Sequence, residues 1–594
     1  MYVLGVICIG VGMRSSINTS RDYFQAGRSL PTWVCALAFI GASMGAQEVI
    51  GMGAAGAGFG FRAALYFLLG TIPALLFVAR FMMPLYYGSG ALTLPGYLGM
   101  RFNTRTRVLS AGLFVAMALA SAGIALFMVA RIFQALRIFD SLFFAYGWPR
   151  ENIFMVCILM AAVPVLVYVM VAGLRGTIVS QIVQFLLLLA GLLPVVWIGL
   201  KNIGGWSGLQ NSLTPLMPDA ITGMGRAGIA AVALVLGFVL GLARWTTDFR
   251  VLQMAMAAKD ADAARRIPII AAAARLAVPF LLVLSGAIAI SLPTPQTKTV
   301  VHNQNGEIFH EITIVPKAIS EGHGLVPALI DPATNNARLD NTGHAILDYG
   351  MATPNLLMHF AGSSLLGLAF AALLGSLMSS VATSVMAVST IFACDLYPPL
   401  LQKPPSDADQ LRAARWAAAV GLLLSVGGAF AIAAFSGKNS TPLISASLVA
   451  LLLVFTVLQA PQLATFILGA FTRRTAGNAA FAGLLAGVVT ALLHYGLTLP
   501  ANAKPGLQGG WLSVVHRYPG VLAQAGFTVA FSFAANLGVA WAMSLGASGK
   551  PVSELKNLVY KSPKAKLPKT GRKRPEILAG IVILITLVLA LVFA

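Results

Sequence analysis

The chain has 594 residues, of which 58% are hydrophobic and only 10% are charged. A water-soluble protein of this size needs more polar surface than that, so the composition excludes an ordinary soluble globule. The net charge of +21 does not indicate a nucleic-acid partner, because the basic residues are dispersed between apolar stretches rather than gathered in one patch. The composition therefore predicts a protein whose partner is the lipid bilayer, with no nucleic acid.

Apolar stretches recur along the whole chain, and each is long enough to cross a hydrocarbon core of about 30 Å as a helix. A membrane β-barrel would show shorter, alternating segments instead. We therefore expect an all-α polytopic membrane protein with about 14 transmembrane helices. The expected spans lie near residues 1–13, 32–55, 63–87, 108–130, 152–173, 176–200, 226–243, 267–292, 357–394, 414–435, 441–471, 476–498, 522–545 and 576–594.

The distribution of Lys and Arg predicts the orientation of these spans. Most of them fall in loops on one side if the N-terminus lies outside, and the positive-inside rule places that side in the cytoplasm. Two of these cytoplasmic loops are 244–266 and the basic loop 549–574, which is also expected to contact anionic lipids. We expect a multi-pass protein of a cell (inner) membrane, bacterial by its short loops, with both termini outside.

One long polar segment, from about 293 to 355, is expected as a solvated loop on the outer side. It contains four of the seven histidines, and a metal site is one interpretation of them, but no pair has the tight spacing of metal ligands. The four cysteines are scattered among apolar segments, which matches neither a disulfide framework nor a zinc site. We therefore assign no metal-binding chemistry to either set.

The first long span is poor helix material around a carboxylate. Glycines at 41, 45, 51, 53, 56, 58 and 60 flank Gln47 and Glu48. A carboxylate inside a membrane needs a partner or a cavity, and an interrupted helix exposes backbone carbonyls that can hold an ion or a substrate. We expect a broken helix with a functional role here; the alternative is that the glycines only permit close helix packing.

The span near 357–394 carries hydroxyl residues on one face of an otherwise apolar helix: Ser376, Ser379, Ser380 and Thr383. Paired serine hydroxyls that face the carbonyls of a broken helix would form an uncharged oxygen cage for a monovalent cation. The alternative is ordinary hydrogen bonding between membrane helices. The pattern alone leaves both interpretations open.

Several segments resemble one known family. RDYFQAGRSLPTWVCALAFIGASMGAQEVIGMGAAGAGFG is similar to the opening signature of the sodium:solute symporter family. ALTLPGYLGMRFN, GLRGTIVSQIVQ, RWTTDFRVLQMAMAAKDADAARR and SLMSSVATSVMAVSTIFACDLYPPLL then follow in the family's order, and the sodium/glucose branch is the most similar. The resemblance implies a single transporter domain over 1–594 with two inverted five-helix repeats and discontinuous first and sixth core helices. The repeats would span 32–200 and 226–471, preceded by a leading helix at 1–13 and followed by trailing helices over 476–594.

The resemblance implies Na⁺ as the coupling ion. Its ligands would be the main-chain carbonyls of Gly41, Met44 and Ser376 and the hydroxyls of Ser379 and Ser380. Gln181 stands where the family often has an aspartate that is linked to a second cation. We therefore expect one sodium ion per solute.

The same resemblance implies that the solute is small and polar, most readily a monosaccharide such as glucose or galactose. Ser43 and Glu48 occupy the positions of an asparagine and a glutamine that the sugar branch offers to its substrate. Arg244 falls on the gating tyrosine of the sixth helix, and Arg275 on a lysine of the seventh. Arg275 is expected either to pair with Glu48 or to extend toward the cytoplasmic headgroups.

Other functions compete with sugar transport. Arg275 would suit a carboxylate-bearing solute such as an amino acid or a monocarboxylate. A non-transporting membrane sensor would normally carry an added signalling domain, and the basic loop 549–574 is too short for one. No enzyme is expected, because the one GxSxG match, 41–45, lies inside an apolar span.

Overall fold

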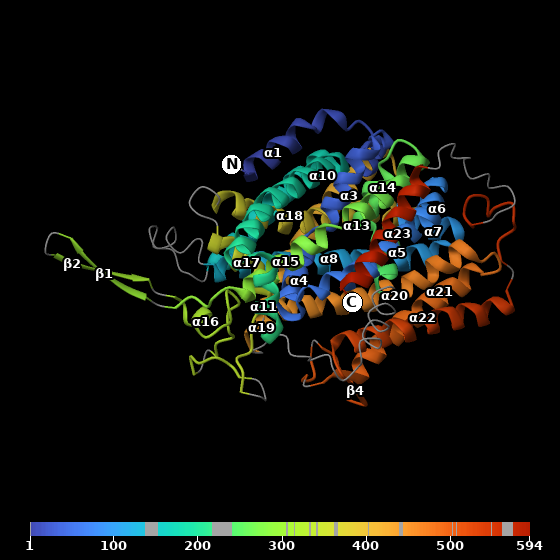
Figure 1. Ribbon diagram of the computed structural model, residues 1–594. Helices are drawn as coiled ribbons and strands as arrows, with labels where there is room; N and C mark the ends of the chain where they lie inside the picture. Colours follow the sequence, from blue (N-terminus) through green and yellow to red (C-terminus); the bar gives the residue numbers. More distant parts are fainter. Residues whose placement is uncertain are drawn as a thin grey trace.

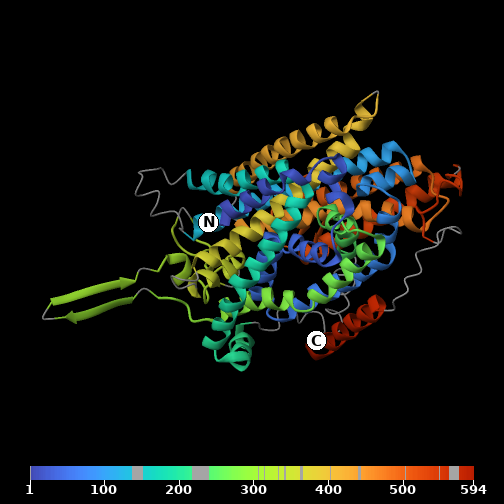
Figure 2. The same cartoon turned by 90° about the horizontal axis from the view of Figure 1, so that it is seen from above.

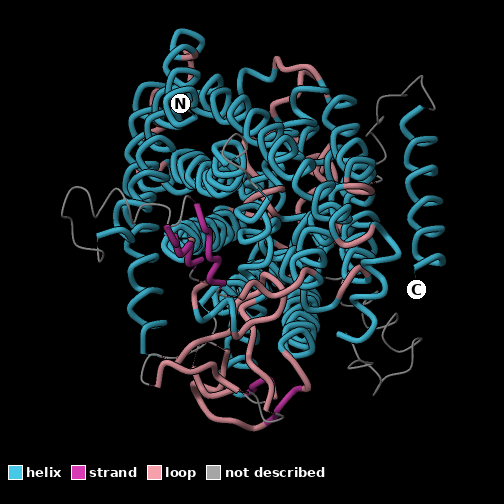
Figure 3. The backbone as a smooth tube through the Cα atoms, turned by 60° about the vertical axis from the view of Figure 1, so that its left-hand side comes forward, coloured by secondary structure: helices cyan, strands magenta, loops and turns pink. Residues whose placement is uncertain are grey.

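The computed structural model describes most of the chain. The described residues are 2–136, 152–216, 240–296, 298–304, 307–313, 315–331, 334–339, 343–360, 366–401, 403–438, 443–501, 503–506, 508–547, 549–560 and 574–593. Long helices lie alongside one another and form a bundle (Figure 1). The largest group of loops gathers at one end of this bundle (Figure 3).

The helices of the first half of the chain are α1 (Tyr2–Gly12), α2 (Ser20–Gln25), α3 (Thr32–Ser43), α4 (Ala46–Phe59), α5 (Arg62–Phe77), α6 (Met83–Gly88), α7 (Leu94–Arg101), α8 (Thr104–Ala135), α10 (Asn152–Asn202), α11 (Gly205–Leu216), α13 (Phe249–Met256), α14 (Ala261–Ala274) and α15 (Val278–Ser291). Those of the second half are α16 (Lys317–Ser320), α17 (Ala352–Phe360), α18 (Leu366–Ile391), α19 (Asp407–Lys438), α20 (Leu443–Phe471), α21 (Gly477–Leu497), α22 (Val521–Leu545) and α23 (Arg574–Phe593). Four short strands complete the described elements: β1 (Lys298–Gln304), β2 (Glu307–Thr313), β3 (Thr498–Pro500) and β4 (His516–Tyr518).

Several of these helices are long and apolar enough to cross a membrane. The described residues contain nine such helices, or ten if the bent pair α3 and α4 is one span. The expected span 226–243 falls largely outside the described residues, so the break expected in the sixth core helix does too. A multi-pass helical architecture is confirmed, whereas the number of 14 spans and the inverted repeats stay predictions.

Burial separates the inner helices from the outer ones. The apolar part of α18 is 83% buried, and α18 packs against α8 and α10. The corresponding parts of α19 and α22 are only 33% and 28% buried. The serine-bearing helix thus lies in the middle of the bundle, where polar side chains can face other helices rather than lipid.

The expectation of an all-α chain with a plain outer loop is wrong in one respect. Within 293–355, β1 and β2 form an antiparallel hairpin that projects from the bundle in both views (Figure 1 and Figure 2). The strands are rich in β-branched residues, and the sequence between them is Asn305–Gly306, a pair that favours tight hairpins. A prediction based on the length of apolar stretches does not detect this short hairpin sequence. A second, parallel strand pair joins β3 to β4.

The first long span is broken, as predicted. Helix α3 ends at Ser43, α4 begins at Ala46, and the two helices are bent by 56° relative to each other. Met44 and Gly45 lie between them with non-helical backbone, Gly45 being extended at φ −74° and ψ 179°. The break leaves carbonyl groups near the end of α3 without the partners that a continuous helix would supply.

The segment 244–266 is largely helical rather than a plain loop, and its place on the cytoplasmic side stays a prediction. Residues Phe249–Met256 form α13, and every one of them is buried. Arg250 and Asp248 are buried with them and form an ion pair. The positive-inside rule treats basic residues between spans as solvent-exposed. A basic residue that is neutralised by a neighbouring carboxylate can instead lie inside the protein.

Candidate functional site

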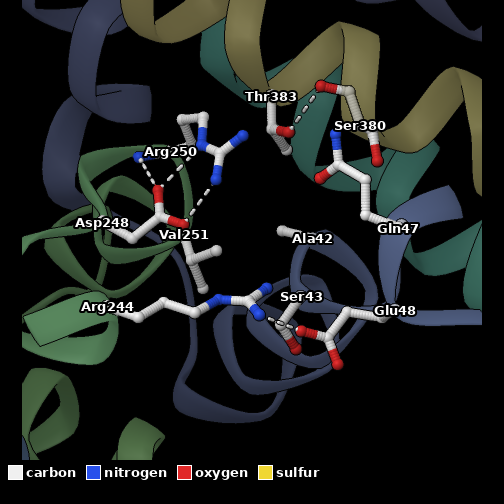
Figure 4. A pocket seen from close by; sticks show the side chains of 11 residues that line it. Ala42, Ser43, Gln47, Glu48, Arg244, Asp248, Arg250, Val251, Ser380 and Thr383 are labelled. Carbon is white, nitrogen blue, oxygen red and sulfur yellow. Dashed lines mark hydrogen bonds and ion pairs between the residues drawn. The ribbon is translucent and has the colours of Figure 1, made fainter. Parts of the chain in front are cut away.

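A small pocket lies at the break between α3 and α4. The pocket is narrow and partly open to the surroundings. Figure 4 shows Arg250 and Asp248 across the pocket from Gln47 and Ser380, and Arg244 reaching toward Ser43 and Glu48. The lining residues are Ala42, Ser43, Gly45, Gln47, Glu48, Arg244, Asp248, Arg250, Val251, Ser380 and Thr383.

Glu48, on the first turn of α4, lies between two arginines. Arg275 Nη1 lies 3.2 Å from Glu48 Oε2, and Arg244 Nη1 forms an ion pair with Oε1. The other end of the Arg275 guanidinium donates a hydrogen bond from Nη2 to the carbonyl of Ser43 at 3.0 Å. Arg275 therefore fixes both the carboxylate of α4 and a carbonyl that the end of α3 leaves free.

Arg275 does not extend toward the headgroups, so that alternative is wrong. Its side chain is 2% exposed. Arg275 is the first residue after α14, in the short turn that separates α14 from α15. The guanidinium also lies over the ring of Trp245, 4.9 Å from its centroid. Because a buried guanidinium needs both a counter-charge and hydrogen-bond acceptors, its contacts with Glu48 and Ser43 account for its position.

A second ion pair forms another wall of the pocket. Arg250 Nε and Nη2 contact Asp248 Oδ1 and Oδ2 at 2.9 and 2.8 Å, and Nη1 donates to the hydroxyl of Ser121. Gln47 Nε2 donates to the carbonyl and to the hydroxyl oxygen of Ser121, at 3.0 and 3.1 Å. Sequence reasoning missed this wall, although Asp248 and Arg250, two residues apart in the segment RWTTDFRVLQ, were a visible signal.

On the opposite side of the break, α18 meets α3 and α10. The hydroxyl of Ser379 is 3.3 Å from the carbonyl oxygen of Gly41 and also contacts Gln181 Oε1. Gln181 Nε2 donates in return to the carbonyl of Ser379 at 3.4 Å. The structure thus brings together two of the residues expected to hold sodium, Gly41 and Ser379, and it places Gln181 in contact with Ser379.

The other three expected sodium ligands lie close by in the chain. Ser380 lines the pocket against Gly45, so closely that a Cβ at Gly45 would overlap its Oγ. Met44 donates its backbone N–H to the Gly41 carbonyl at 3.0 Å. The hydroxyl of Ser376 donates to Leu373 within α18 at 2.9 Å, which leaves the role of Ser376 to its carbonyl.

The donors in this region are all neutral oxygens. Among the described residues, no three His, Cys, Asp or Glu side chains are grouped so that they could hold a metal ion. Carbonyl and hydroxyl oxygens are hard ligands that can replace the hydration shell of an alkali ion. The donor set therefore fits a monovalent cation better than a transition metal.

Comparisons with known proteins agree with this geometry. The sequence profile of the "Sodium:solute symporter family" matches residues 23–487. The chain belongs to that family. It is a sodium-coupled symporter of the multi-pass membrane type, with Na⁺ as its coupling ion, and the family consists of transporters rather than enzymes.

Individual relatives are distant but cover most of the chain. The sodium/glucose cotransporter of Vibrio parahaemolyticus is 26% identical over 517 residues, which is 82% of each chain. The sodium/myo-inositol cotransporter 2 of Homo sapiens is 23% identical over 83% of this chain and 68% of its own. A solved Na⁺-coupled sialic acid symporter, 17% identical, superimposes with a TM-score of 0.65 over 92% of this chain and 97% of its own, which shows the shared fold.

Proposed function

We propose that this symporter carries a small hydroxylated solute of the sugar or polyol class into the cell, with one sodium ion per solute. The observation that supports this most directly is the break at Met44 and Gly45. It places a set of neutral oxygens and a pocket of hydrogen-bonding side chains against each other. The names of two relatives, a sodium/glucose and a sodium/myo-inositol cotransporter, support the solute class.

The sodium ligands in this proposal are the carbonyls and hydroxyls expected from the sequence: Gly41, Met44, Ser376, Ser379 and Ser380. In the structure Ser379 donates to the Gly41 carbonyl and to Gln181. When sodium binds, these hydroxyls turn their lone pairs toward the ion, and the ion takes the place of the hydrogen bond between α18 and α3. Sodium would thereby hold the end of α3 against α18.

Sodium and solute are coupled through shared residues. Ser380 is both a proposed sodium ligand and part of the pocket wall, beside Gly45. An ion that fixes Ser380 and the end of α3 also fixes one wall of the solute pocket, so each ligand favours the conformation that binds the other. The coupling free energy is reciprocal, and solute should therefore raise the affinity for sodium.

The proposed solute contacts are Ser43, Glu48 and Arg244, which line the pocket. Arg275 acts behind them, because its contacts with Glu48 and the Ser43 carbonyl position both residues. Gln47, Arg250 and Thr383 also line the pocket and add donors and acceptors for hydroxyl groups. Such a mixture of amide, hydroxyl and paired charged groups suits a solute with several hydroxyls.

Three broader expectations belong to the same proposal. The repeats over 32–200 and 226–471 are inverted copies that move relative to each other, and both termini lie outside a bacterial inner membrane. The neutral Gln181 in place of an acidic residue accounts for a single sodium ion. Without a carboxylate at this position, the protein lacks the negative charge that would bind a second cation.

Uptake into proteoliposomes tests the proposal. The parent protein is supplied with labelled glucose, galactose, myo-inositol and their acidic derivatives, with and without an inward sodium gradient. Uptake of at least one of these should require the gradient, and Ser380→Ala should raise the sodium concentration for half-maximal uptake about tenfold, as expected for loss of one ligand worth ~1.4 kcal/mol.

Ser376→Ala is the matched control, since it keeps the carbonyl and loses only a hydroxyl bonded within its own helix. Its sodium dependence should stay within about twofold of the parent. Sodium-dependent binding without any flux would overturn transport in favour of a sensor.

A further inference from the structure

Among the residues that the structure describes, the charges around the pocket do not balance. Arg244, Arg250 and Arg275 contribute three positive charges, and Glu48 and Asp248 contribute two negative charges. The buried Asp395 beyond the end of α18 does not compensate, because it is paired with Arg107 at 2.7 Å. A net positive charge inside a membrane is costly unless a counter-charge or water accompanies it.

The three arginines differ in how far they are satisfied. Arg250 is held at both ends by Asp248 and Ser121, and its side chain is 6% exposed. Arg275 is held by Glu48 and the Ser43 carbonyl and is 2% exposed. Arg244 shares Glu48 with Arg275, lies on the pocket wall and is 29% exposed. The surplus charge is therefore presented to the pocket by Arg244.

The geometry of Arg244 suits a planar anion. The centre of its guanidinium lies 5.6 Å from the ring centroid of Trp245 and 5.6 Å from that of Phe455, while one nitrogen contacts Glu48. Contacts with two aromatic rings and a carboxylate restrict the guanidinium, and a guanidinium held in place recognises a carboxylate through two parallel hydrogen bonds. Figure 4 shows this side chain lying across the pocket beside Ser43 and Glu48.

We propose that the solute is an acidic sugar, whose carboxylate binds Arg244 while its hydroxyls bind the rest of the pocket. This inference rests on the proposed function, and it names the solute class of that same site. The carboxylate would supply the missing negative charge, so the occupied pocket would be neutral. In this proposal the anchor is Arg244 rather than Arg275, because both terminal nitrogens of Arg275 already contact Glu48 and the Ser43 carbonyl.

The proposal has a consequence for energetics. One Na⁺ carried with one carboxylate moves no net charge, whereas one Na⁺ carried with a neutral sugar moves one positive charge. A potential of 100 mV changes the equilibrium accumulation of a solute by roughly 50-fold when one charge moves with it. Accumulation of an acidic sugar should instead be nearly independent of the potential.

The experiment uses the parent protein in proteoliposomes with an inward sodium gradient, with and without an inside-negative potassium diffusion potential of about 100 mV. The probes are two matched pairs, glucuronate with glucose and galacturonate with galactose. We expect sodium-dependent uptake of at least one acid, at least tenfold better than its neutral partner. The potential should change its accumulation by less than about twofold.

Arg244→Gln should reduce uptake of the acid at least tenfold and reduce the preference over the neutral partner, whereas Arg244→Lys should retain part of both. Arg412→Gln, at an exposed ion pair with Asp409, is the matched control and should behave as the parent. The potential measurement needs only the parent protein, so it decides the proposal even if a variant does not fold.

Sodium-dependent uptake of a neutral sugar alone, driven by the potential, would overturn the acidic-solute proposal and leave the proposed function standing. Uptake of the acid that is unaffected by Arg244→Gln would overturn the role of Arg244. If none of the four probes shows sodium-dependent uptake, the inference fails, and the proposed function fails with it if myo-inositol is not taken up either.

Discussion

The two sides of the break in the first span solve different electrostatic problems. Toward α18, Gly41, Ser379 and Gln181 offer only neutral oxygens and an amide. Toward α13 and α14, Glu48 and its arginines form a network of full charges. A cation that must leave again is better held by dipoles, whereas a pocket that must recognise one solute gains specificity from fixed charges whose partners lie within the protein.

The largest effect is expected on the charged side. Glu48→Gln leaves Arg275 buried beside Arg244 without their shared carboxylate. Removing one partner of a buried pair costs about 3–5 kcal/mol, so the variant should be strongly destabilised and inactive in uptake. The midpoint of thermal unfolding in detergent measures the stability, and uptake is measured in proteoliposomes.

A double substitution distinguishes loss of charge balance from loss of a solute contact. Glu48→Gln with Arg275→Gln removes one charge of each sign, and part of the lost thermal stability should return because no additional unpaired charge stays buried. Equal stability of the single and double variants would show that the pair does not govern the fold of this side. Uptake should stay low in both, since the proposed solute contact is absent.

The next effect concerns the contact that joins the two sides. Gly45→Ala places a methyl group where Ser380 Oγ lies, so α18 and the break must separate. Overpacking of this kind costs about 1–3 kcal/mol, and sodium affinity should fall about tenfold or more. Gly58→Ala, whose added Cβ would lie 4.0 Å from Tyr349, is the matched control. If both variants bind sodium as the parent does, the close approach at Gly45 is not needed.

On the neutral side, Ser379→Ala should raise the half-maximal sodium concentration by about tenfold and lower the free energy of unfolding by about 1 kcal/mol. The hydroxyl bonds to Gly41 and Gln181, so both elements lose a shared contact. Ser389→Ala removes a buried hydroxyl of the same helix that donates to Ala414 instead, at 2.8 Å. Identical sodium dependence of the two variants would argue against Ser379 as a ligand.

Sequence reasoning predicted the fold well where one local rule decided the outcome. Glycines around Gln47 and Glu48 predicted that the first span is broken, because weak helix propensity and an intramembrane carboxylate occur together, and the structure has the break at Met44 and Gly45. It failed where tertiary context overruled composition. Arg244 and Arg250 were counted as loop residues, since the sequence does not show that Glu48, far away in the chain, and Asp248 neutralise them.

The candidate site shows the same division. The pairing of Glu48 with Arg275 was among the alternatives because each needs a partner, and the structure brings them to 3.2 Å. The second ion pair of Glu48, with Arg244, was not expected, because no sequence pattern relates residues 48 and 244. Asp248, Arg250 and Ser121 were missed altogether, since their contact depends on how α8 packs beside the break.

The smallest effect tests the contrast itself by adding a charge to the neutral side. Gln181 is fully buried and contacts Ser379, so Gln181→Glu would place a carboxylate beside the proposed sodium ligands at nearly constant size. The carboxylate attracts sodium when ionised and binds a proton otherwise, because burial without a cation disfavours its charge. Sodium affinity should therefore rise by a few-fold at high pH and return to the parent value at low pH, whereas the parent should show no such dependence.

Sodium titrations of uptake at several pH values measure this difference between Gln181→Glu and the parent. An affinity that is unchanged at every pH would mean that Gln181 lies outside the field of the ion, and the neutral set would then reduce to the carbonyls and serines of α3 and α18.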